Sequence, residues 1–238
     1  MKLKPGQYYK RMARTSDQHP FNGRGASFPN VKEFEKQIAV SKGQLISLLN
    51  RLEDIFQTVH PCDETFLTYG HEIRNLLILA CTEVEAQWKG ILDVHRYEAK
   101  SKHTTNDYFK LNDALHLSEY SVTLPFYPWL PKIHPFKEWN KDNPTQSLEW
   151  YDAFHKIKHD REEHFDKAQL KHTINAVCAC YIMLFAQYGM EIHKQRHEIP
   201  VFFNIVDFPN WCCSEIYTHP YKHDHIEFEY SPVFYSFD

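Results

Sequence analysis

The stretch WYDAFHKIKHDR at Trp150–Arg161 is followed closely by an almost unbroken apolar run, INAVCACYIMLFA at Ile174–Ala186. The apolar run is shorter than the ~20 residues that span a bilayer, so it predicts the central helix of a protein core. The stretch before it combines two histidines, two lysines and an arginine. Because charged side chains are seldom buried without partners, this stretch is the best candidate for a functional site.

Apolar residues recur at three- and four-residue spacing around this core, which is the pattern of amphipathic helices. The pattern predicts helices over residues 31–60, 68–92, 147–163 and 166–190, with a weaker one over 105–116. Pro61 ends the first helix, and Gly189 lies near the end of the last. Glu72 and Glu83 are three turns apart on the second helix, so we expect them on nearly the same flank.

The rest of the chain has a different composition. Residues 118–148 alternate proline with aromatic residues, which excludes helix and central strand and predicts a segment packed on the core. Pro200–Phe208 and Ile226–Phe237 are rich in β-branched and aromatic residues, which predicts two or three short strands in a hairpin-like appendage. The expected organisation is an arm at 1–30, a helical bundle at 31–195 with an insertion at 118–148, and a β-rich carboxyl-terminal appendage at 196–238. The predicted fold class is therefore mainly α.

Composition indicates a globular protein of ordinary chemistry. The chain has 238 residues, of which 42% are apolar and 24% charged, and its net charge is −4. This net charge gives no overall positive field of the kind that favours nucleic-acid binding. The 16 histidines nevertheless allow the net charge of the chain to vary between about pH 5 and 7. Six cysteines and an amino terminus without an apolar leader predict reduced thiols, a cytoplasmic location and no membrane association.

The helical wheel of the polar stretch separates its side chains. Trp150, Phe154 and Ile157 gather on one side, and Arg161 falls within that side if the helix continues. A separate polar stripe holds a pair of histidines one turn apart, and Lys158 lies between the two sides. One interpretation is therefore structural, in which the stem of Arg161 packs in the core.

In that structural interpretation the guanidinium of Arg161 forms a buried ion pair with Glu72 or Glu83, and the protein is a non-catalytic structural or protein-interaction domain.

The other interpretation is a site that handles phosphate. Cleavage of RNA by transesterification needs a base near the 2′-hydroxyl and a cation or acid at the phosphate, and it needs neither metal nor cofactor. His159 has the chemistry of an acid–base group near neutral pH, and Lys158 and Arg161 have that of phosphate ligands. His155, Glu72 and Glu83 would support them.

A resemblance points the same way. The motif PFKEW at Pro135–Trp139, EWYDAFHKIKHDR at Glu149–Arg161, the small apolar residues of 168–186 and TEVEAQWKGIL at Thr82–Leu92 together resemble uncharacterised bacterial helical proteins of the HEPN type. The resemblance covers about residues 31–190. It implies a helical bundle, a homodimer, and binding or metal-independent cleavage of RNA or nucleotides. It also implies an antitoxin or other partner protein and a role in bacterial defence or stress. It places the site at Lys158, His159 and Arg161, although the catalytic motif of the family has the arginine before the histidine.

A metal-dependent hydrolase is the third hypothesis. His155 and His159 stand one helical turn apart, and Glu162 or Asp166 could complete a ligand set. A second cluster near the carboxyl end contains Cys212, Cys213, His219, His223 and His225. Adjacent cysteines do not match the spaced pairs of zinc sites, so we expect no metal there.

Overall fold

The computed structural model describes residues 3–14, 31–97, 102–194, 198–212, 214–217 and 230–237. Helices dominate it and its strands are short, which confirms the predicted mainly α fold with a small β part. The α-helices are α1 (Val31–Thr58), α2 (His71–Val94), α3 (Thr105–Leu115), α4 (Glu149–His159), α5 (Arg161–His164), α6 (Leu170–Tyr188) and α7 (Glu198–Phe202). The 3₁₀ helices are η1 (Asp63–Thr65), η2 (Leu117–Glu119), η3 (Phe165–Lys167) and η4 (Gly189–His193). The strands are β1 (Gln7–Tyr9), β2 (Ser121–Thr123), β3 (Asn204–Asp207) and β4 (Ser231–Val233).

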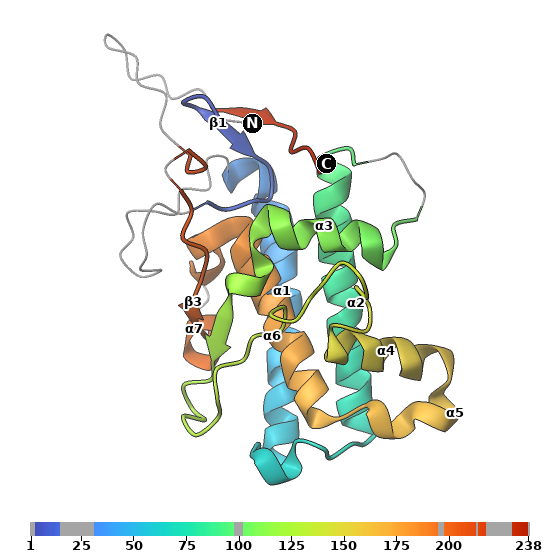
Figure 1. Cartoon of the computed structure of the whole chain (residues 1–238). Coiled ribbons are helices and arrows are strands. Elements are labelled where there is room, and N and C mark those ends of the chain that lie inside the picture. Colours follow the sequence, from blue (N-terminus) through green and yellow to red (C-terminus); the bar gives the residue numbers. More distant parts are fainter. Residues whose placement is uncertain are drawn as a thin grey trace.

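Helix α6 is the centre of the bundle. It packs most extensively against α2, and α1 and α4 also pack against it (Figure 1). Cys178 and Cys180 are fully buried in it, as expected for cysteines that act as small apolar residues. The segment Leu170–His193 is long and apolar enough to cross a membrane by length and composition, but 89% of its most apolar window is buried inside the protein. A core helix passes the same test, so this is weak evidence for a membrane span.

Residues 118–148, the proline-rich segment, pack onto α2, as the sequence predicts. Trp88 on α2 stacks on Trp139 with ring centroids 5.0 Å apart, and it also contacts Tyr108 and Tyr151. The indole of Trp139 donates a hydrogen bond to the carbonyl of Pro144. These rings close one side of the bundle with large apolar surfaces, which makes the segment part of the core.

The carboxyl-terminal strands pair differently from the expectation. Strand β3 pairs antiparallel with β2, and β4 pairs parallel with β1. The predicted hairpin-like appendage is therefore wrong: each strand instead joins a distant part of the chain to the bundle. The segment predicted as the strand Pro200–Phe208 also begins with the short helix α7.

The described part of the amino-terminal arm, residues 3–14, is docked on the bundle of its own chain. Tyr8 and Met12 are fully buried, and the amide of Ala13 donates to the carbonyl of Ala186 at 2.8 Å. Arg11 is also buried, and its Nε donates to Oε1 of Gln187 at 2.7 Å. Docking within one chain means that this segment needs no partner subunit to hold it.

Gly90 on α2 provides the space in which the Arg11 guanidinium lies. A Cβ at residue 90 would lie 2.1 Å from Nη1 of Arg11. The guanidinium of Arg11 has little room to move away, because it is buried and its Nε is hydrogen-bonded to Gln187. We expect Gly90→Ala to lower the free energy of unfolding by about 1–3 kcal/mol, despite the better helix propensity of alanine. Gly43→Ala is the matched control, because nothing lies within 4 Å of a Cβ there, and we expect it to stabilise. Urea denaturation measures the free energy of unfolding of both variants. If both substitutions changed it in the same direction, the expectation would be contradicted.

His95 ties the amino- and carboxyl-terminal segments together and makes stability depend on pH. Its Nε2 donates to the carbonyl of Lys10 at 2.8 Å, while its Nδ1 accepts from the amide of Tyr235 at 3.1 Å. Only the neutral ring makes both bonds. Burial lowers the pKa of His95 from 6.5 to about 4. As the pH falls below 6.5 the unfolded chain is protonated first, so this contribution is present above pH 6.5 and is lost toward pH 4.

We therefore expect His95→Gln, whose amide can make both bonds at any pH, to lose less stability on acidification than the wild type. Between about pH 7 and about pH 5 the difference should approach 2 kcal/mol. Urea titrations of both proteins at the two pH values measure it. Identical pH dependence would show that His95 does not contribute.

Candidate functional site

The polar stretch folds as a corner between two helices. Helix α4 ends at His159, and α5 begins at Arg161. Asp160 separates them: its Oδ1 accepts from the amide of Glu163 at 3.2 Å and caps the start of α5. The predicted continuous helix over 147–163 is therefore wrong at this residue. The break changes the direction of the chain between His159 and Arg161.

The break also moves Arg161 out of the core. Its side chain is exposed, and no ion pair holds it among the residues that the structure describes. Glu72 is exposed at the start of α2, and Glu83 accepts a hydrogen bond from Nε2 of Gln87 at 3.0 Å. The expected buried ion pair of Arg161 with Glu72 or Glu83 is therefore wrong, and the two glutamates do not converge on one site.

Lys158 is held by a carboxylate that the sequence did not single out. Its Nζ lies 3.9 Å from Oε2 of Glu85 and 4.8 Å from the ring centroid of Phe154. The other oxygen of Glu85 accepts a hydrogen bond from the hydroxyl of Tyr151 at 2.6 Å. Lys158 itself remains exposed, so this ion pair is a weak restraint on a solvent-facing cation.

His155 is a packing residue beside the corner. Its ring lies 4.8 Å from that of Tyr151 and 5.9 Å from that of His159, centroid to centroid. Its Nε2 is buried and has no hydrogen-bond partner in the described part of the chain. Burial lowers the pKa of His155, so its ring stays neutral at pH 7. Of the two histidines, His159 is the one exposed to solvent.

The residues of the metal-dependent hypothesis do not gather in the described part of the chain. No group of three or more histidine, cysteine, aspartate or glutamate side chains there is placed to hold a metal ion, and this includes His155, His159, Glu162 and Asp166. In the second cluster, Cys212 is exposed and its Sγ donates to Glu215. The other members, Cys213, His219, His223 and His225, lie outside the described residues.

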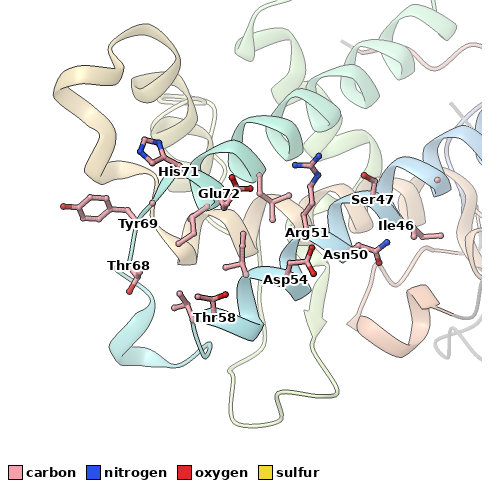
Figure 2. A pocket seen from close by; sticks show the side chains of 16 residues that line it. Ile46, Ser47, Asn50, Arg51, Asp54, Thr58, Thr68, Tyr69, His71 and Glu72 are labelled. Atoms are coloured by element: carbon pink, nitrogen blue, oxygen red, sulfur yellow. The ribbon is translucent and has the colours of Figure 1, made fainter.

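A large groove between α1 and the start of α2 is a feature that the sequence did not predict. Its volume is about 1000 Å³, and Figure 2 shows Arg51 and Asp54 of α1 and His71 and Glu72 of α2 around the same hollow. All four side chains are exposed. Its apolar lining comes from Ile46, Ile55, Val59, Ile73 and Leu76. The groove thus offers an apolar floor and a polar rim, which is the usual character of a ligand site.

The groove and the corner are neighbours. Phe165, the first residue of η3 after α5, lies 5.0 Å from the ring of His71 and 5.8 Å from that of Tyr69, centroid to centroid. Tyr69 and His71 both line the groove. The chain that follows Arg161 therefore packs directly against one end of the groove.

Comparison with known proteins finds no matching family model, no matching curated protein and no matching solved structure.

Proposed function

We propose that the chain is a HEPN-like module that binds RNA or nucleotides at the corner between α4 and α5, and that it cleaves RNA there without metal. In this proposal Lys158 and Arg161 bind phosphate, and His159 acts as the acid–base group. The resemblance in sequence supports the same reaction class. The same proposal makes the protein a cytoplasmic homodimer that acts in bacterial defence or stress and is controlled by a partner protein.

The observation that carries the proposal is the helix break at Asp160. On a continuous helix His159 and Arg161 would point in different directions, because two residues turn the helix by about 200°. The break releases them from that constraint. Both are exposed, and neither is held by an ion pair among the described residues, so they are available to a phosphate.

The chemistry fits these groups. The neutral imidazole of His159 takes the proton of a 2′-hydroxyl, the 2′-oxygen bonds to the adjacent phosphorus, and the bond from phosphorus to the 5′-oxygen breaks. The 5′-oxygen takes a proton from solvent water, and the imidazolium of His159 returns its proton to solvent. The products are a 2′,3′-cyclic phosphate and a 5′-hydroxyl, and no electrons are exchanged with a cofactor. The guanidinium of Arg161 is suited to the extra negative charge on the phosphate oxygens in the transition state.

The observations favour this proposal over the structural alternative. That alternative required Arg161 to be buried in an ion pair, whereas its side chain is exposed. An exposed arginine at a chain corner contributes little to stability, so Arg161→Gln should leave the fold intact and change ligand binding alone.

The test is RNA binding at several salt concentrations, measured by the fluorescence anisotropy of a labelled RNA. We expect Arg161→Gln to weaken binding and to reduce the slope of log affinity against log salt by about 1, because one phosphate contact is lost. Lys89→Gln, which removes an exposed lysine from α2, is the matched control for net charge. Absence of binding by the wild type, or equal slopes for wild type and Arg161→Gln, would refute the proposal.

A further inference from the structure

The groove between α1 and α2 combines charged side chains at its rim with an apolar lining. Arg51 is its exposed arginine, and Asp54 and Glu72 are exposed carboxylates at its rim. No ion pair joins any of these three to another described residue. The groove therefore presents one guanidinium and two carboxylates above an apolar floor, and none of the three is held in an ion pair within the described residues.

An aromatic side chain stands at the end of the groove nearest the corner. Tyr69 is 51% exposed, although its backbone is fixed by a β-bridge to Gln169. The ring of Phe165 packs against it at 88°, edge to face. These contacts hold the ring of Tyr69 in place while half of its surface faces solvent, which is the requirement for a stacking platform.

A second exposed aromatic ring lies beside the segment that follows α1. Trp129 is 53% exposed, and its indole donates to the carbonyl of Pro61 at 2.8 Å. Its ring stacks on that of His60 at 5.0 Å, and His60 is the neighbour in sequence of Val59, which lines the groove. Trp129 itself does not line the groove, so Tyr69 is the exposed aromatic ring that the groove offers to a flat ligand.

We propose that this groove binds unpaired nucleotides of a single-stranded RNA, with a base stacked on Tyr69 and a phosphate on Arg51. The inference rests on the proposed function, since it supplies the strand that the corner would cleave. The carboxylates of Asp54 and Glu72 accept hydrogen bonds from amino groups on the edges of unpaired bases. In a duplex these faces and edges are covered by neighbouring bases, so a duplex cannot use the groove.

Binding in the groove should differ from binding at the corner in how its affinity depends on salt concentration. Stacking is independent of salt, and the rim carries two carboxylates beside its arginine. Removing Tyr69 should therefore lower affinity about equally at all salt concentrations, whereas removing Arg161 at the corner should change the salt slope. The two surfaces can thus be tested separately in one assay.

The experiment is anisotropy titration of a labelled oligoadenylate of about a dozen nucleotides, as a single strand and as a blunt duplex with oligouridylate of the same length. We expect the wild type to prefer the single strand. Tyr69→Ala should weaken single-strand binding by about 5- to 150-fold, and Tyr69→Phe, which keeps the ring, should restore most of it. Phe234→Ala is the matched control, because Phe234 is 53% exposed and lies outside the groove. Circular dichroism establishes that each variant is folded.

The outcomes separate the two proposals. If the wild type binds the single strand and the duplex equally, or if Tyr69→Ala binds the single strand as the wild type does, the groove does not bind unpaired RNA. In that case a loss of binding in Arg161→Gln would still support the corner. If the wild type binds neither RNA, both proposals fail.

Discussion

Trp88→Ala is expected to lower the free energy of unfolding by about 3–5 kcal/mol, the largest effect of any single substitution considered for this fold. The side chain of Trp88 is fully buried, and it stacks on Trp139 at 5.0 Å. It also contacts Tyr108 of α3 and Tyr151 of α4. Truncation therefore leaves a cavity where α2, α3, α4 and the proline-rich segment meet. Urea denaturation followed by circular dichroism measures the loss.

Trp88→Phe is the control for this prediction. The Nε1 of Trp88 is buried and has no hydrogen-bond partner among the described residues, so phenylalanine removes volume without removing a hydrogen bond. We expect a clearly smaller loss than for alanine. A loss below about 1 kcal/mol for Trp88→Ala would mean that the aromatic cluster does not hold these elements together.

The second large effect is expected on catalysis. His159→Ala should slow RNA cleavage in EDTA by about 10²- to 10⁴-fold, the usual contribution of a general acid or base. His159 is exposed at the end of α4, so its removal should leave stability nearly unchanged. The rate is measured by gel electrophoresis of an end-labelled RNA at a saturating enzyme concentration.

His164→Ala is the matched control, because His164 ends the adjacent helix α5 and is also a histidine of the corner. We expect it to cleave at nearly the wild-type rate. If instead His164→Ala is inactive and His159→Ala is active, the acid–base role assigned to His159 is wrong.

The helical core was predictable because one physical signal dominates it. Apolar residues at three- and four-residue spacing must share a helix face, and the bundle buries those faces. The helix predicted over 31–60 is observed as α1, and that over 68–92 as α2. The apolar run Ile174–Ala186 lies in α6, which is buried on almost every side.

The corner was not predicted, because a local hydrogen bond overrides the helical periodicity there. The sequence Asp160–Glu163 carries a signal for a new helix start, with a capping aspartate and a glutamate three residues later. Giving this signal more weight than the helical wheel would have placed Arg161 at the surface. The wheel assigned it to the core because it assumed an unbroken helix.

The pairing of strands and the groove depend on contacts between distant parts of the chain. Strand β4 could have paired with many segments, and three residues carry no pattern that selects β1. Glu85 was missed for a similar reason: periodicity assigns it to a face of α2, but does not show that Tyr151 and Lys158 of α4 pack against that face. Arg51 and Tyr69 have no motif, and only the fold places them in one groove.

The most direct test of the account is the chemistry of the RNA ends produced in EDTA. The wild type should cleave an end-labelled single-stranded RNA to fragments that carry a 2′,3′-cyclic phosphate, and a folded His159→Ala, Arg161→Ala double variant should not. Failure of the wild type to cleave at micromolar concentration, or equal cleavage by the double variant, would contradict the assignment of the corner between α4 and α5 as a ribonuclease site.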